Sequence, residues 1–244
     1  MSFLCRPKKT LFFLLVLFGF FFASEVQAAT WYVDTATGNN TNAGTGWDAP
    51  VAQMVRAQAL AANGDTIMVK SGTYVEPTTA GGSTGNIFFS KAIAWIADDG
   101  SGGAGSVIVR AASTANSTVA AFIGTAVQSW TGFTFDGQGT IPFVMLGQTA
   151  PQSNKTWTNV TFKDGTAAGQ LLRFYSTPGG TNNVCNNCVF TGTGATGVRS
   201  DATPVVLNNP TFSMTTSGAV GVSLSTNLIN GSIITGGTAT LTGT

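Results

Sequence analysis

A short pattern recurs in the second half of this chain: a residue that tolerates the left-handed backbone conformation is followed three positions later by a large apolar residue. The five segments are Gly132–Phe135, Asn159–Phe162, Asn187–Phe190, Asn209–Phe212 and Asn230–Ile233. Their apolar members are 27, 28, 22 and 21 residues apart, which is in the range of solenoid repeats. Asn and Gly reach the left-handed conformation at low cost, so the pattern predicts the same sharp turn in every coil.

Side chains alternate between the two faces of a strand, so two residues in each segment share a face. We predict that these pairs point inward as a buried column: Phe133/Phe135, Val160/Phe162, Cys188/Phe190, Pro210/Phe212 and Gly231/Ile233. Stacked coils place equivalent residues about 4.8 Å apart, so like side chains can form ladders. A β-sandwich does not require one motif to return in every coil, and the pattern therefore favours an all-β parallel β-helix.

The first 28 residues are typical of a secretory leader. Basic residues at 6, 8 and 9 precede an apolar run over 11–22, and Val26-Gln27-Ala28 has small residues where signal peptidase cleaves. The run is shorter than the roughly 20 residues that a membrane-spanning helix needs. We expect cleavage after Ala28, a secreted, periplasmic or cell-surface location, and no stable membrane insertion. A retained membrane anchor is the alternative.

Residues 29–244 are numerous enough for one domain with a continuous core. They carry eight basic and nine acidic side chains without a basic run, so nucleic acid is not an expected partner. Abundant Gly, Thr, Ser and Asn suit short strands and tight turns. The recurring Phe, Val and Ile residues favour a packed core over a disordered stalk.

The segment after the leader has a characteristic order. A strand at Trp31–Asp34 is followed by a loop at Gly44–Trp47 and by a helix that we expect to begin at Asp48 as N-cap and to end near Ala62. The segments Gly64–Val69 and Gly72–Tyr74 come next. This order resembles the N-terminal part of right-handed parallel β-helix proteins of the pectate-lyase-like superfamily, in particular secreted polysaccharide lyases.

The resemblance implies a right-handed parallel β-helix with a short N-terminal capping helix, in which the strand after Gly64 starts the first coil. Its motif covers about 45 residues, and many functions share this fold. Residues 236–244 contain neither a capping helix nor a charged closing strand, although solenoids need a polar end. We therefore expect that the β-helix domain is truncated at its C-terminus or covered there by a partner.

Several classes of site are excluded by composition. The chain has no histidine, which excludes Ser/His/Asp and Cys/His nucleophilic sites and most zinc sites. Its glycine-rich stretches do not lie between a strand and a helix, as phosphate-binding loops do. Cys185 and Cys188 flank a tight turn, and they are either a disulfide or two small buried residues.

The resemblance to lyases implies a basic side chain that removes the proton next to a uronate, and Ca²⁺ on Asp carboxylates that neutralises the substrate. Asp136 follows Phe135 and Lys163 follows Phe162, so both would stack on the outer face of adjacent coils. Lys163 and Asp136 are the catalytic candidates, and Asp136 and Asp164 are the candidate Ca²⁺ ligands. The alternative is a solvated salt bridge beside a turn.

Four further residues are candidates for substrate binding: Arg173, Arg199, Trp157 and Tyr175. Arg199 and Asp201 alternate on one face as a second ion pair, and sugar rings stack on exposed aromatic side chains. Packing in the core or at turns is the alternative for the aromatic residues.

The sequence thus predicts an exported β-helix that acts on or binds polysaccharide and resembles lyases. The alternative is a non-catalytic surface or adhesive solenoid that binds glycans or protein partners. Whether the chain is an enzyme stays open, and convergence of Asp136, Asp164 and a third carboxylate around a groove would favour catalysis.

Overall fold

The structure is a computed structural model that describes residues 27–76, 85–113, 117–148, 151–175, 179–224, 233–235 and 238–241. The basic and apolar parts of the proposed leader lie outside these residues. In the part of the chain that is described, no helix has the length and hydrophobicity needed to cross a bilayer.

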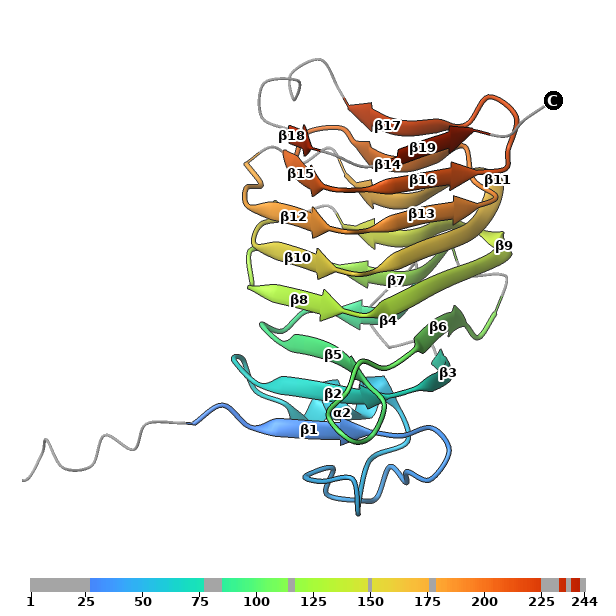
Figure 1. The fold of residues 1–244 in the computed structure, drawn as a ribbon. Coiled ribbons are helices and arrows are strands. Elements are labelled where there is room, and N and C mark those ends of the chain that lie inside the picture. The colour runs from blue at the N-terminus through green and yellow to red at the C-terminus, as the bar shows by residue number, and fades with distance from the viewer. Residues whose placement is uncertain are drawn as a thin grey trace, which may run out of the picture.

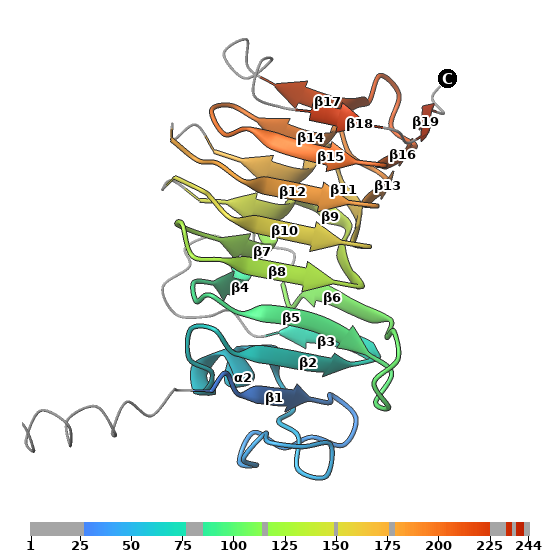
Figure 2. The same cartoon turned by 60° about the vertical axis from the view of Figure 1, so that its left-hand side comes forward.

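Parallel strands stacked in coils build the molecule (Figure 1). Eight of them form one sheet, called face 1 (Figure 2). In spatial order they are β1 (Thr30–Val33), β2 (Thr66–Lys70), β5 (Ala94–Asp98), β8 (Gln128–Thr131), β10 (Lys155–Thr158), β12 (Asn183–Asn186), β15 (Val205–Asn208) and β18 (Ile233–Thr235).

The second sheet has 11 strands and turns a corner. Its first part, face 2, contains β3 (Gly72–Glu76), β6 (Val107–Ala111), β13 (Val189–Gly192), β16 (Thr211–Met214) and β19 (Thr238–Leu241). Its second part, face 3, contains β4 (Gly85–Phe89), β7 (Thr118–Phe122), β14 (Thr196–Ser200) and β17 (Val220–Leu224). The long strands β9 (Phe133–Gly147) and β11 (Thr161–Phe174) belong to both faces.

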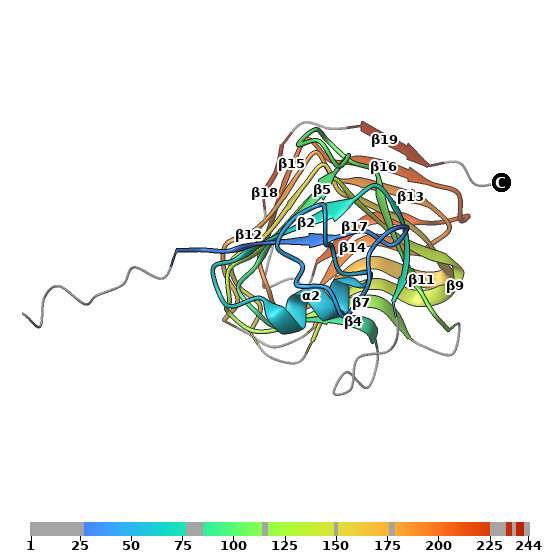
Figure 3. The same ribbon diagram turned by 90° about the horizontal axis from the view of Figure 1, so that it is seen from below.

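Seen along the stack, strands of successive coils superpose on three sides (Figure 3). Between β2 and β17, each coil therefore contributes one strand segment to each face, and the core lies between the faces. The expected all-β parallel β-helix with a short N-terminal helix is confirmed.

The interior of face 1 is a ladder of large side chains in register. Trp95, Trp130 and Trp157 follow one another on β5, β8 and β10, and all three are fully buried. The rings of Trp130 and Trp157 stack with centroids 5.3 Å apart. Cys185 and Leu207 continue the ladder on β12 and β15.

The predicted column of face 2 is confirmed for four segments. The rings of Phe135, Phe162, Phe190 and Phe212 stack with successive centroid distances of 5.9, 5.2 and 4.9 Å. The turn residues at their heads have positive φ: Gly132 (79°), Asn159 (53°), Asn187 (52°) and Asn209 (51°).

The fifth segment was wrongly predicted. Ile233 lies in β18 on face 1, in register with Val206, whereas Phe212 pairs with Ala239 of β19. Ala239 is 27 residues after Phe212, the same step as from Phe135 to Phe162. The column therefore continues with a small residue, whereas the pattern predicted a large one, Ile233, six residues too early. Asn230 lies outside the described residues.

The asparagines at the turns form a hydrogen-bonded ladder between coils. Asn187 Nδ2 donates to Asn159 Oδ1, and Asn209 Nδ2 donates to Asn187 Oδ1, both at 3.1 Å. The repeated asparagine therefore supplies both the left-handed turn and a bond to its neighbour.

The corner of the third of these coils carries a disulfide. Cys185 and Cys188 are bonded and fully buried, with Asn187 between them in the left-handed conformation. Of the two alternatives open from the sequence, the structure contains the disulfide.

The helix α2 (Met54–Leu60) lies across the N-terminal end of the stack (Figure 3). Its N-cap is Gln53 rather than Asp48 as predicted. The chain around Val51 first pairs with β1, because Asp34 N–H donates to Val51 O and Val51 N–H donates to Tyr32 O. The helix can begin only after this pairing ends.

Side chains from later coils hold both ends of α2. The carboxylate of Glu76 accepts the N–H groups of Met54 and Val55 at 2.7 and 3.2 Å. Burial raises the pKa of Glu76, although these two hydrogen bonds oppose the increase. At the other end, Lys91 Nζ donates to the carbonyls of Gln58, Ala59 and Ala61. The two side chains satisfy groups that a short helix leaves unpaired.

Candidate functional site

The outward side of face 2 carries a row of ionic side chains. Arg110, Asp136 and Lys163 are in register on β6, β9 and β11. Asp136 Oδ2 lies 2.9 Å from Arg110 Nη2 and 3.8 Å from Lys163 Nζ. Lys163 Nζ also lies 3.1 Å from Asp164 Oδ2. The structure thus brings Asp136, Lys163 and Asp164 together.

Asp136 stacks beside Lys163 on the outward side, as predicted, but its carboxylate is covered by neighbouring groups. It is 2% exposed, whereas the side chains of Arg110 and Lys163 are 38% and 34% exposed. Its second oxygen, Oδ1, accepts the N–H of Gln138 at 2.9 Å. The hydrogen bonds from Arg110 and Gln138 and the longer ion pair with Lys163 together cover the carboxylate.

Asp136 and Asp164, the predicted calcium ligands, both have protein partners. Both carboxylates pair with the Lys163 ammonium, and Asp164 Oδ1 also accepts the N–H of Thr193 at 3.3 Å. Calcium needs six to eight oxygen ligands, and the described residues contain no group of three or more His, Cys, Asp or Glu side chains that could hold a metal. No third carboxylate converges on this pair there.

A second ionic cluster lies on the outward side of face 3. Arg173 and Arg199 are in register on β11 and β14. Both bind one carboxylate: Arg173 Nη2 lies 2.9 Å from Asp201 Oδ2, and Arg199 Nε lies 3.0 Å from Asp201 Oδ1. Two guanidinium groups share one carboxylate, so this cluster has excess positive charge.

Aromatic rings surround Arg173. Its guanidinium carbon lies 4.5 Å from the centroid of the Tyr175 ring and 5.5 Å from that of Phe143. Arg173 Nη1 also donates to Gln170 Oε1 at 3.0 Å. These contacts hold Arg173 in place at 14% exposure, whereas Arg199 is 41% exposed. Tyr175 is half-buried in the loop after β11. The cluster therefore combines a fixed guanidinium, an accessible one and an aromatic ring.

The sequence predicted Trp157 as a substrate-binding residue, but this side chain does not reach the outer surface. Its side chain is fully buried and packs against Trp130, Phe122 and Phe174. It lies between Thr156 and Thr158, which face outward, so alternation directs its ring into the core. Of the four predicted substrate-binding residues, Arg173, Arg199 and Tyr175 lie together and Trp157 does not.

The sequence interpretation missed Lys155, which is fully buried. Its Nζ donates to the carbonyls of Gly124, Ala126 and Ser153 at 2.9, 2.6 and 2.9 Å. Burial lowers the pKa of Lys155 to about 8. Lys155 is two positions before Trp157, so the alternation that buries the tryptophan also identifies this lysine as inward-facing. No sequence pattern indicated Phe143, because its contact with Arg173 depends on the pairing of β9 with β11.

Comparison with known proteins supports the fold. No family model and no curated protein sequence matches this chain. A solved structure of a rhamnogalacturonan lyase superposes on 89% of the chain with a TM-score of 0.56 and 19% sequence identity. The chain covers 66% of the length of that lyase, a little under two thirds. At this identity, the similarity shows that the two proteins share the parallel β-helix fold.

Proposed function

We propose that this protein is an exported polysaccharide-binding β-helix that takes an acidic polysaccharide on the outward side of face 3. The observation that carries the proposal is the sharing of Asp201 by Arg173 and Arg199 beside the Tyr175 ring. One carboxylate cannot neutralise two guanidinium groups, so the cluster attracts a further anion.

A uronate residue of a polysaccharide matches this cluster. Its carboxylate can accept two parallel N–H groups from a guanidinium, which is a strong and directional contact. Arg199 suits this role because its side chain is 41% exposed and binds Asp201 through Nε. The ring of Tyr175 offers an apolar surface for the C–H groups of the same sugar.

Lyase activity at Lys163 is the second candidate function. The fold shared with a rhamnogalacturonan lyase favours it, and lyase chemistry needs a base to remove a proton next to a uronate. The Nζ atom of Lys163 already pairs with the carboxylates of Asp136 and Asp164, so it is not free to face a substrate. The geometry therefore supports binding better than catalysis, and calcium-assisted cleavage is left to the assay.

The binding proposal is tested with Arg199→Gln. This variant keeps the Arg173–Asp201 pair, so the fold should survive. We expect affinity for polygalacturonate to fall about tenfold, the equivalent of roughly 1.4 kcal/mol, because a charge-assisted hydrogen bond is lost. The matched control is Arg56→Gln on α2, far along the chain from Arg199. The guanidinium of Arg56 donates to the Asn40 carbonyl. Equal affinity of both variants, or equal binding of a neutral glucan, would refute the proposal.

Catalysis is tested separately. Release of unsaturated uronate from polygalacturonate and rhamnogalacturonan is followed with calcium and with a chelator. Activity that disappears in Lys163→Met would establish the second candidate. Absence of product on every acidic polymer would eliminate it and leave the binding function.

A further inference from the structure

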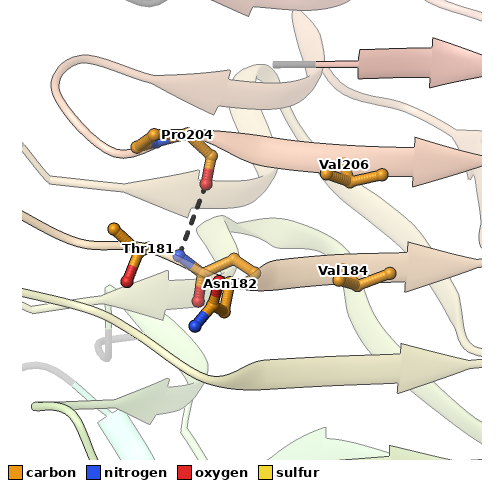
Figure 4. Close-up of a pocket in the computed structure, with 6 residues that line it drawn as sticks. Thr181, Asn182, Val184, Pro204 and Val206 are labelled. Atoms are coloured by element: carbon orange, nitrogen blue, oxygen red, sulfur yellow. Dashed lines mark hydrogen bonds between the residues drawn. The ribbon is translucent and has the colours of Figure 1, made fainter. Parts of the chain in front are cut away.

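A small hollow opens on face 1, on the outward side of the strands (Figure 4). None of the residues that line it belongs to the Arg173 cluster. Its volume is about 350 Å³, and it lies where β12 and β15 begin. Its lining consists of Thr181, Asn182, Asn183, Val184, Pro204 and Val206.

The walls of the hollow are fixed by hydrogen bonds. Asn183 is buried, and its Nδ2 donates to the carbonyls of Gln152 and Pro204 at 2.9 and 3.4 Å. Asn182 has a φ of 57°, and its Nδ2 donates to Asn154 Oδ1 at 3.1 Å. These bonds tie the loops before β12 and β15 to each other and to the coil below. The hollow is therefore formed before any ligand arrives, which lowers the entropy lost on binding.

The lining combines an aliphatic floor with an uncharged polar edge. Val184 and Val206 are neighbours in the register of β12 and β15, and Pro204 extends the apolar surface. Thr181 and Asn182 are exposed and provide a hydroxyl and an amide. No lining residue is charged, so nothing in the hollow compensates the desolvation of a uronate or a phosphate.

A neutral pyranose has the matching chemistry. One side of its ring presents C–H groups that can cover the aliphatic floor, and its hydroxyls can bond to the polar edge. The volume is at the small end of the roughly 300–1,000 Å³ typical of ligand sites, which suits a single ring rather than a folded peptide.

The surface beside the hollow would accommodate further sugars. On β8, β10, β12 and β15 the outward positions are uncharged: Ser129, Thr131, Thr156, Thr158, Val184, Asn186, Val206 and Asn208. Asn208 Nδ2 donates to Asn186 Oδ1 at 2.8 Å, which orients both amides along the stack. The charged clusters lie on faces 2 and 3 instead. The outward side of β8, β10, β12 and β15 is thus neutral, in contrast to the two ionic clusters.

We infer that the hollow formed by Thr181–Val184, Pro204 and Val206 is a binding subsite for a neutral sugar ring. It is a second site, and its existence does not depend on the function proposed for face 3.

The test uses methyl β-galactopyranoside as probe and the methyl signals of valine in NMR spectra of the full chain as readout. We expect saturable shifts of Val184 and Val206 with a dissociation constant in the millimolar range, about 4 kcal/mol of binding free energy. The corresponding methyl galacturonide, which differs by its carboxylate, should shift them at least tenfold less at equal concentration. Equal shifts would overturn the assignment to neutral sugars.

Two variants locate the site. Asn182→Gly removes the side-chain amide and keeps a residue that tolerates positive φ. Val206→Thr replaces one methyl group of the floor by a hydroxyl and keeps the shape of the side chain. Each should weaken binding roughly five- to tenfold, whereas Val189→Thr on the outward side of β13 should not change it. Unchanged binding in both variants, or no shift of the wild-type protein at roughly 50 mM sugar, would overturn the proposal. Arg199→Gln should bind this probe normally, which separates a failure here from a failure of the face 3 proposal.

Discussion

The phenylalanine column of face 2 gives the most quantitative prediction, through Phe190→Ala. Phe190 is fully buried and lies between two parallel rings, 5.2 Å from that of Phe162 and 4.9 Å from that of Phe212. Deleting the ring breaks both contacts and leaves a cavity in the middle of the stack. The neighbouring rings are held by their own strands, so they cannot collapse fully into the space.

The expected loss of unfolding free energy follows from these contacts. A buried Phe→Ala change costs about 3–5 kcal/mol in total, of which two aromatic pairs account for roughly 1–3 kcal/mol. Because two pairs are lost and relaxation is limited, we expect about 4 kcal/mol. At an m-value of about 3 kcal/mol/M, this lowers the urea midpoint by roughly 1.3 M.

The measurement is urea unfolding followed by circular dichroism. Val189→Ala is the matched control, because Val189 precedes Phe190 on the same strand and faces outward at partial exposure. It should cost less than about 1 kcal/mol. If Phe190→Ala costs no more than this control, the stacked column does not stabilise the solenoid and the reasoning fails.

Three further predictions concern buried polar groups and the disulfide. Lys155→Met should cost about 3 kcal/mol, because Lys155 is fully buried and three carbonyls lose their donor. Lys91→Met, in a half-buried site where water can replace the amine, should cost about 1 kcal/mol. Equal losses in urea unfolding would contradict the role of burial. Burial alone would raise the pKa of Asp34, but hydrogen bonds from Thr37, Lys70 and the nearby backbone lower it to about 2. The folded-state pKa lies below the ordinary 3.8, so ionised Asp34 adds about 2 kcal/mol to the free energy of unfolding. This stability is present above pH 3.8 and is lost as the pH falls through 2. Acid unfolding of Asp34→Asn should lack this component. The disulfide is fully buried, so mass spectrometry should detect free thiols after dithiothreitol only at urea concentrations that unfold the coil, and rapid reduction in native buffer would contradict this burial.

The parts of the fold that repeat could be predicted from the sequence. A left-handed turn at Asn159, Asn187 and Asn209 fixes the phase of the next strand, so alternation alone places Phe162, Phe190 and Phe212 in the core. The pattern failed at the last coil because Ala239 occupies the position of the large residue. A small side chain satisfies the same geometry but gives no hydrophobic signal.

The candidate site was less predictable. Sequence register correctly placed Lys163 next to Asp136, since both follow a column residue by one position. Register does not say how deeply a side chain is buried. Asp136 is covered by Arg110, which lies before the recurring segments and is not part of their pattern. The contact between Arg173 and Tyr175 depends on the loop after β11, and no periodic pattern predicts loop geometry.

The capping of α2 has a consequence for the order of folding. The helix has seven residues, too few to persist alone in water. Its N-terminal N–H groups are satisfied by Glu76, and its C-terminal carbonyls by Lys91. The cap therefore cannot be completed until the ribosome has delivered Lys91, the residue that leads into the next coil. The helix that covers the N-terminal end of the solenoid is therefore completed only after the first coil has been synthesised. A nascent chain that stops before Lys91 should leave this end frayed.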